Sequence, residues 1–403
     1  MLIEDVNLSH CINIKSENSW DVDFAYLKEY FPLLKKKLSP DKPMGIGLKI
    51  SDTVSKFLVN DKEQNNLKAW LTRAGGYVAT INSHYDELPD AVNRVLSLNY
   101  NWISADRKNY TIRLAKIMQG ILPDGMDGSI STYPLNYRHL FIKGKAYAYA
   151  KTIATNNIIN VICHLVTQKI NTGKSIHLDI SPKSNGMIET GNEFINWFEN
   201  DLQPVATPVL MRNFQLTYSQ AIATLKNHLR LCYDIGNFSG EFENHKVFIE
   251  KLQEKKIKIG KIKINAILMA HLPAELKERF NIVTTFSNLN KGQLNQVVAR
   301  KKNNELLKYR DISFAINDFE NDQVNEWRVS FHVPVSSIYA DTITSSQSDI
   351  IEVFNLIKKY KLTQLFEIEI DHHAEKFNGT QIPLTDLLHD ELEWVIHQLS
   401  KIG

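Results

Sequence analysis

Cysteine is scarce in this chain of 403 residues, and its three copies lack the spacing of a metal site. Cys11, Cys163 and Cys232 each lie in an apolar run, where reduced and buried thiols are usual. Long apolar runs are missing too. No stretch approaches the roughly 20 residues that a membrane-spanning helix needs, and the first residues lack the basic start and apolar core of a signal peptide. We therefore expect a cytoplasmic protein without a transmembrane segment.

The chain also lacks an excess of charge of one sign. It has 47 basic and 45 acidic residues, a net charge of +2, so no overall field attracts nucleic acid or an anionic membrane. Its basic runs, such as Lys35–Lys37, lie in helix-like patterns and are typical of a solvated face. No Walker loop, zincin helix, nucleophile elbow or dinucleotide-binding glycine motif is present. We expect no nucleic-acid partner.

The sequence does contain a recurring alternation of strand-like and helix-like segments. Eight short apolar stretches have strand character, at Leu8–Asn13, Gly45–Ile50, Tyr77–Ile81, Gly128–Thr132, Ile176–Ile180, Arg230–Asp234, Ile257–Ala266 and Leu365–Ile370. About eight strands alternating with helices predict an α/β fold, a (β/α)8 TIM barrel, rather than an open sheet. We expect a single domain over residues 1–403, with a long insertion at about 267–360 before the last strand. Within that insertion we expect a helix around Gly292–Tyr309.

Carboxylates end three of the predicted strands. Asp179, Asp234 and Glu369 close the fifth, sixth and eighth strands, and active sites of α/β barrels collect side chains from those ends. Converging carboxylates suit Mg²⁺, Mn²⁺ or Zn²⁺, with His332 as a nitrogen ligand. Two alternatives stay open: each carboxylate is solvated or salt-bridged, and His332, which has apolar neighbours, is a satisfied core histidine.

Other polar residues near the strand ends are candidates for catalysis and substrate binding. Lysine on a barrel strand is unusual, so Lys263 is a candidate acid–base group that faces the substrate, although an end position also reaches solvent. His84 is a second acid–base candidate. The candidate substrate-binding residues are Asn82, Ser131, Asn237 and Asn265. For Ser131, ordinary turn chemistry is the alternative.

Several stretches, in this order and spacing, resemble the EboE-type metabolite traffic proteins, a branch of the xylose-isomerase-like barrel superfamily. They are Ser9–Asn13, Gly47–Ser51, Thr80–Asn82, Tyr110–Leu114, Gly128–Thr132, Leu231–Asp234, Phe331–Pro334 and Phe366–Glu369. The resemblance implies a (β/α)8 barrel with a divalent-metal site whose ligands fall on Asp179, Asp234, His332 and Glu369. It also implies a small-molecule metabolite, a natural-product pathway and a membrane prenyltransferase-like partner.

The chain departs from that family pattern at the expected metal site. Leu178–Pro182 stands where the family has Leu-Glu-Pro-Glu-Pro, and Ile235–Asn237 where the family has Thr-Cys-His. The sequence therefore leaves two alternatives equally open: the protein binds a divalent metal, or it has no cofactor. Three functions follow: a metal-dependent sugar isomerase or phosphoesterase-like hydrolase, a non-catalytic metabolite-binding barrel with a degenerate metal site, and an assembly protein of a membrane-bound biosynthetic or export system.

Overall fold

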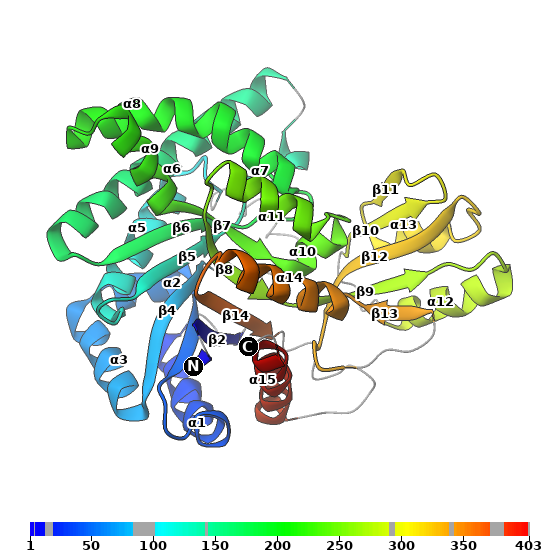
Figure 1. Cartoon of the computed structure of the whole chain (residues 1–403), viewed down its shortest axis with the longest axis horizontal. Helices are drawn as coiled ribbons and strands as arrows, with labels where there is room; N and C mark the ends of the chain where they lie inside the picture. Colours follow the sequence, from blue (N-terminus) through cyan, green and yellow to red (C-terminus); the bar gives the residue numbers. More distant parts are fainter. Residues whose placement is uncertain are drawn as a thin grey trace.

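Eight parallel strands close into a barrel in the computed structural model, which describes residues 1–3, 5–12, 19–83, 101–141, 144–289, 295–337, 342–370 and 383–401 (Figure 1). The strands are β2 (Val6–Ile12), β3 (Met44–Ile50), β4 (Gly76–Ser83), β5 (Asp127–Thr132), β6 (Ser175–Ile180), β7 (Leu229–Asp234), β8 (Ile259–Ile264) and β14 (Leu365–Ile370). Parallel pairing of β2 with both β14 and β3 closes the ring. A short strand β1 (Leu2–Ile3) pairs antiparallel with β2. The predicted barrel is confirmed, and each strand lies where its apolar stretch indicated.

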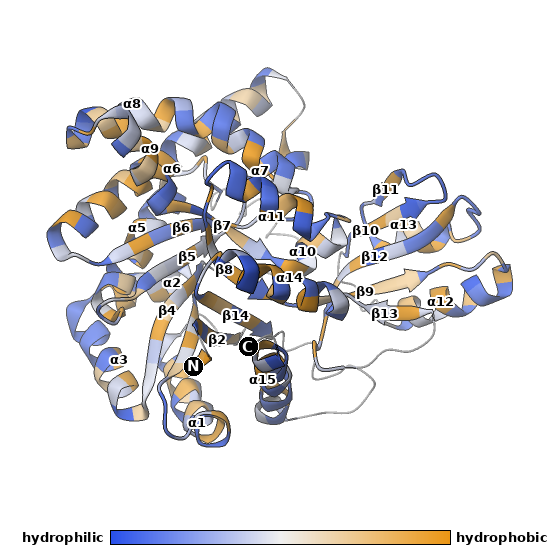
Figure 2. Ribbon diagram, in the orientation of Figure 1, coloured by the Kyte–Doolittle hydropathy of each residue, from blue (hydrophilic) through white to orange (hydrophobic). Residues whose placement is uncertain are grey.

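A layer of helices surrounds this barrel. Its members are α1 (Trp20–Leu38), α2 (Asp52–Leu58), α3 (Asp61–Ala74), α5 (Ala105–Ile121), α6 (Lys145–Thr172), α7 (Gly191–Trp197), α8 (Gln203–Phe214), α9 (Tyr218–His228), α10 (Ile235–Gly240), α11 (His245–Glu254), α14 (Gln347–Tyr360) and α15 (Leu384–Lys401), with short turns η2 (Arg138–Leu140) and η3 (Phe198–Leu202). Side-chain caps begin many of them; Thr190 and Thr217 form capping boxes. Each helix carries hydrophilic and hydrophobic residues, as an amphipathic layer requires (Figure 2).

The chain leaves the barrel after β8 and builds a second sheet. Its order is β11-β10-β12-β9-β13, all antiparallel, and it projects to one side of the barrel (Figure 1). The elements are β9 (Ala266–His271), α12 (Leu276–Leu289), β10 (Val297–Lys301), β11 (Leu306–Tyr309), α13 (Ile312–Asn317), β12 (Val324–Val333) and β13 (Ile343–Ser345). The insertion expected at 267–360 covers this sheet together with α14, which packs against α11 and α15 in the helix layer of the barrel.

The helix expected around Gly292–Tyr309 is wrong. Val297–Lys301 and Leu306–Tyr309 form a hairpin instead. The β-branched pair Val297 and Val298 favours a strand, and Asn304 takes a left-handed φ of 67° in the turn. Pairing with β12 then buries the apolar face of the hairpin.

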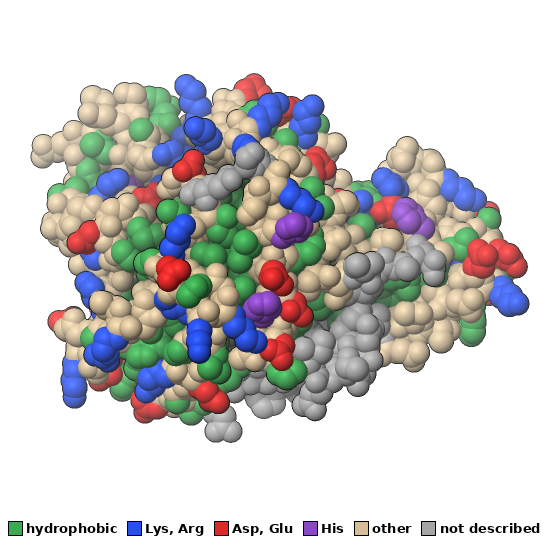
Figure 3. Space-filling model, turned by 60° about the horizontal axis from the view of Figure 1, so that its bottom comes forward, with side chains coloured by type: hydrophobic (Ala, Val, Ile, Leu, Met, Phe, Trp, Pro, Cys, Tyr) green, Lys and Arg blue, Asp and Glu red, His purple; other side chains and the backbone are tan. Residues whose placement is uncertain are grey.

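Charge is spread over the surface of the molecule. Figure 3 shows basic and acidic side chains interspersed on one face, with apolar side chains between them. Among the described helices, none is long and apolar enough to cross a bilayer.

Candidate functional site at the carboxyl ends of the strands

Lys263 lies at the centre of the polar groups at the barrel mouth, by which we mean the carboxyl ends of the eight strands. Its ammonium contacts the carboxylate of Glu369 and lies 3.7 Å from Oδ2 of Asp234. The three residues come from adjacent strands, because β8 pairs with β7 on one side and with β14 on the other. The Lys-Ile-Lys-Ile alternation of β8 turns its lysines toward the inside of the barrel.

Lys263 and Glu369 hold each other in their charged forms. Burial favours a raised pKa for Glu369, but Lys263 and Lys49 hold that pKa well below its usual range. Burial favours a lowered pKa for Lys263, but Glu369 and Asp234 raise it well above its usual value. Lys263 is therefore an ammonium at neutral pH, so it is a hydrogen-bond donor rather than a proton acceptor.

The turn that follows β7 uses two of the predicted residues. Asp234 caps α10 by accepting a hydrogen bond from the backbone N–H of Asn237 at 3.0 Å. Asn265 accepts one from the N–H of Gly236 at 2.7 Å, and its amide nitrogen lies 3.5 Å from Nε2 of His332. A Cβ at residue 236 would lie 2.7 Å from the Asn265 oxygen, so a larger residue there would displace the Asn265 side chain. Asn265 and His332 thus border the mouth beside Asp234.

A fully buried ion pair lies beneath the mouth. Nζ of Lys261 donates to Glu367 at 2.7 Å and to Asn82 at 2.8 Å. Asn82 donates in turn to Glu367 at 2.8 Å and accepts from Ser131 at 2.6 Å. Thr80 donates to the second carboxylate oxygen of Glu367. We expected Asn82 and Ser131 to bind substrate. Their side chains instead form hydrogen bonds within the buried group around Lys261 and Glu367.

The structure does not bring Asp179 to the other carboxylates. Its Cα pairs with Arg230, so Asp234 lies four residues further along β7, roughly 13 Å at 3.3 Å per residue. Asp179 is fully buried and bonds Ser129 and Nδ1 of His177, both at 2.6 Å. Adjacent barrel strands are staggered, so two carboxylates that each end a strand need not reach the same depth. The expected convergence of Asp179 with Asp234 and Glu369 is wrong.

Three further residues at the mouth had not been predicted. Lys49 follows Gly47 on the inner face of β3, and its charge lowers the pKa of Glu369. Nζ of Lys183 lies 4.5 Å from the ring centroid of Tyr133 and lowers the pKa of that phenol. Lys49 had a usable signal, because it is a lysine near the end of an apolar strand, as Lys263 is. His84, the other acid–base candidate, lies outside the described residues.

The predicted ligand set does not fit a divalent cation in this arrangement. Asp179 lies too deep, and the ammonium of Lys263 lies between Asp234 and Glu369, where a cation would bind. Within the described part of the chain, the His, Cys, Asp or Glu trio whose ligand atoms lie within 4.8 Å of one another is His389, Asp390 and Glu393. These three side chains lie on the outer helix α15, and both acids are exposed. The residues at the mouth therefore favour binding of a ligand through charged hydrogen-bonding side chains rather than binding of a metal ion.

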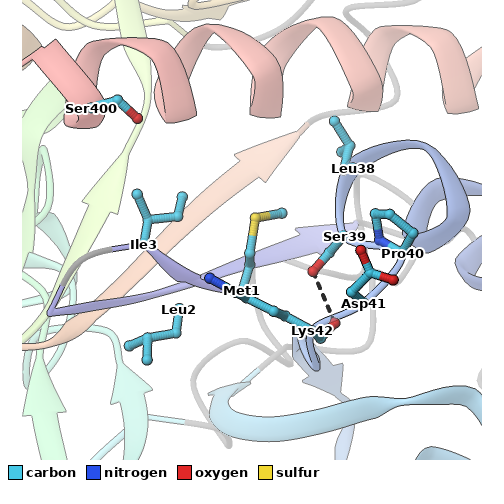
Figure 4. Close-up of a pocket in the computed structure, with 9 residues that line it drawn as sticks. All are labelled: Met1, Leu2, Ile3, Leu38, Ser39, Pro40, Asp41, Lys42 and Ser400. Atoms are coloured by element: carbon cyan, nitrogen blue, oxygen red, sulfur yellow. Dashed lines mark hydrogen bonds between the residues drawn. The ribbon is translucent and has the colours of Figure 1, made fainter.

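A pocket of about 430 Å³ lies at the opposite end of the barrel (Figure 4). It is lined by the start of β1, by residues 38–42 after α1 and by Ser400 near the end of α15. Ser39 closes the turn after α1 by donating to the carbonyl of Lys42 at 2.9 Å. The amino ends of the strands in a barrel serve stability more often than chemistry, so we keep this pocket apart from the candidate site.

Solved structures share this architecture. The chain is similar over 99% of its length to 99% of a protein from Anabaena variabilis described as a sugar phosphate isomerase/epimerase, with 10% identity and a TM-score of 0.53. The two chains share the fold of a (β/α)8 barrel. A xylose isomerase domain protein from Planctomyces limnophilus aligns over 98% of both chains, with 10% identity and a TM-score of 0.49. No protein-family model and no curated protein matches the chain. Identities this low establish the fold alone.

Proposed function

We propose that the mouth of this barrel binds a small, hydroxyl-rich metabolite without a divalent metal. The observation that carries the proposal is the contact of Lys263 with Glu369 and its 3.7 Å approach to Asp234. Sugar hydroxyls both donate and accept hydrogen bonds, so neighbouring hydroxyls match a row of carboxylate, ammonium and carboxylate. The likeness in fold to a protein described as a sugar phosphate isomerase/epimerase supports a sugar as the ligand class.

A metal-dependent sugar isomerase or hydrolase is the second candidate. The likeness in fold to a protein described as a sugar phosphate isomerase/epimerase favours a sugar isomerase, and the position of Lys263 between the carboxylates opposes a metal there. In such an enzyme Lys263 would stabilise negative charge on the substrate as a fixed ammonium rather than transfer a proton, because its raised pKa makes it a weak acid. The EboE-type role in metabolite traffic, with a membrane prenyltransferase-like partner, is a proposal that rests on the strand-end stretches of the sequence.

Ligand screening in the presence of EDTA tests the first candidate. We expect a polyol, sugar or sugar phosphate to raise the melting temperature of the protein in EDTA, and Asp234→Asn to weaken that ligand about tenfold or more, through the loss of a charge-assisted hydrogen bond. Asp386→Asn is the control, because Asp386 is exposed on α15. A ligand whose effect needs Mn²⁺ and disappears in EDTA would refute metal-free binding. Turnover of that ligand, followed by NMR, would then establish the enzyme.

A further inference from the structure

A second group of side chains at the mouth follows the neighbouring strands β5 and β6, which β7 separates from the strand of Lys263. Tyr133 comes directly after β5, and Lys183 comes shortly after β6. The two strand ends are tied together, because the N–H of Ser181 donates to the carbonyl of Thr132 at 2.9 Å. Nζ of Lys183 lies 4.5 Å from the ring centroid of Tyr133. This side of the mouth therefore holds an ammonium beside a phenol.

An ordered turn carries Lys183. Its N–H donates to the carbonyl of Ile188 at 3.1 Å, and its carbonyl accepts from the N–H of Gly186 at 2.8 Å. Asn185 takes a left-handed φ of 62° in this turn, and its carbonyl accepts from the N–H of Arg138 at 2.8 Å. The side chain of Lys183 is exposed. The backbone of this lysine is therefore fixed while its ammonium stays accessible to a ligand.

Lys49 brings another ammonium to the mouth from β3. The register places Lys49 beside Asn82 on β4, and Asn82 beside Ser131 on β5. Tyr133 is two residues beyond Ser131 along β5, so Lys49 and Tyr133 stand two strands apart at the same end of the barrel. Lys49 and Lys183 thus approach Tyr133 from strands on either side of β5.

The positive charges at the mouth outnumber the negative charges. Lys263 contacts Glu369 and lies 3.7 Å from Asp234. Within the part of the chain that the structure describes, no acidic side chain forms an ion pair with Lys49 or Lys183. Three ammoniums therefore stand against two carboxylates. A cleft with an uncompensated positive charge attracts anions, and lysine binds phosphate and carboxylate oxygens as a point charge.

We propose that the ligand of the mouth carries an anionic group, a phosphate ester or a carboxylate, and that Lys183 and Lys49 bind this group. Asp234 and Glu369 then bind hydroxyls of the same molecule. The inference rests on the proposed function, and it adds the charge of the ligand and the residues that select it. On binding, Lys183 exchanges its contact with the Tyr133 ring for a charge-assisted hydrogen bond, which is the stronger interaction.

Calorimetry in EDTA, with neutral sugars beside their phosphate esters and the corresponding sugar acids, is the experiment. We expect an anionic form to bind at least about tenfold more tightly than its neutral parent, and the form that gains more tells phosphate from carboxylate. Lys183→Gln should remove most of that preference, and Lys183→Arg, which keeps the charge, should retain it. Lys28→Gln is the matched control and should change neither affinity, because Nζ of Lys28 lies at the same 4.5 Å from the Phe24 ring on the outer helix α1.

A neutral sugar that binds as tightly as both of its anionic forms would overturn the inference and leave the proposed function intact. Equal weakening of neutral and anionic ligands by Lys183→Gln would overturn it too, since the lysine would then not select for charge. Where no sugar binds, the proposed function fails, and inorganic phosphate is the remaining probe. A phosphate-induced rise in melting temperature that Lys183→Gln abolishes and Lys28→Gln preserves would support the anion site. No rise, or an equal rise in all three proteins, would overturn it, because phosphate stabilises any folded protein by exclusion from its surface.

Discussion

Lys261 and Lys263 are two residues apart on the same face of β8, and their surroundings differ. Lys261 and its partner Glu367 are both fully buried, whereas Lys263 and Glu369 keep side-chain exposures of 16% and 17%. A buried ion pair is weak evidence of net stability, but breaking one leaves an uncompensated charge in a medium that solvates it poorly. We therefore infer that the pair of Lys261 and Glu367 stabilises the barrel, and that the pair of Lys263 and Glu369 takes part in ligand binding.

Lys261→Met should lower the free energy of unfolding by about 3–5 kcal/mol, because Glu367 would remain buried with only Thr80 and Asn82 as partners. Urea unfolding at neutral pH measures the change. Lys37→Met is the control, since Lys37 pairs with Asp386 at exposures of 53% and 51%, and it should cost at most about 1 kcal/mol. The double variant Lys261→Met/Glu367→Leu should recover much of the loss. Equal costs for the two single variants would contradict burial of the pair.

Strands and their order could be predicted at the scale of elements, and pairing registers could not. Apolar stretches of five to ten residues mark where the chain runs extended, so all eight barrel strands were located. Register depends on stagger and bulges, such as the shift between Leu231 and Cys232 where β7 meets β8. For that reason the strand ends brought Asp234, Lys263 and Glu369 into one group of candidates, which lie together in the structure, while the depth of Asp179 could not be foreseen.

The contact of Lys263 with two carboxylates was beyond prediction for the same reason. It depends on how far β8 is staggered against β7 and against β14, and the order of the strands alone does not give that stagger. The second sheet was missed as a sheet because its antiparallel pairings are formed within an insertion, and the pattern of alternating strands and helices does not indicate them. The polar turn residues Asn303 and Asn304 were the available signal for its first hairpin.

A cluster of one lysine and two glutamates joins the hairpin β10–β11 to the barrel. Lys308 on β11 lies 2.6 Å from Glu241 and 2.8 Å from Glu189. Burial raises the pKa of Glu241 to about 7, against the attraction of Lys308. Burial acts in the same direction on Glu189, but hydrogen bonds from Lys308 and the N–H of Asn185 lower its pKa overall. Of the two glutamates, Glu241 is therefore the one whose ionisation is suppressed by folding.

Stability should fall as pH rises through the titration of Glu241. Its ordinary pKa is 4.5 and its folded pKa about 7, so in this window the folded state binds more protons than the unfolded state, and ionisation favours unfolding. The expected loss from this group between pH 4.5 and 7 is on the order of 1–3 kcal/mol. Glu241→Gln should flatten that part of the profile, measured by urea unfolding at a series of pH values. A wild-type profile no steeper than that of the variant would refute the assignment.

The barrel and the second sheet are held together at the scale of the whole molecule by packing around Phe242. This residue lies between α10 and α11, and its ring centroid is 5.0 Å from the guanidinium carbon of Arg300 and 4.0 Å from that of Arg328. Arg328 also donates to the carbonyl of Ser239 at 2.6 Å. Glu326, on β12, contacts both arginines. Because His332 is on that same strand, the position of the sheet also fixes one border of the barrel mouth.

Phe242→Leu should loosen the sheet more than the barrel. It removes two cation–π contacts, each worth about 0.5–2 kcal/mol, while a leucine still fills part of the volume. Hydrogen exchange followed by mass spectrometry should show faster exchange in β10 and β12, with β6 and β7 unchanged, because only the sheet loses a partner. Phe314→Leu is the control: Phe314 lies on α13, in the same insertion as the sheet, and is 58% exposed. Equal acceleration in sheet and barrel would mean that the two unfold as one cooperative unit, and that Phe242 stabilises the molecule as a whole.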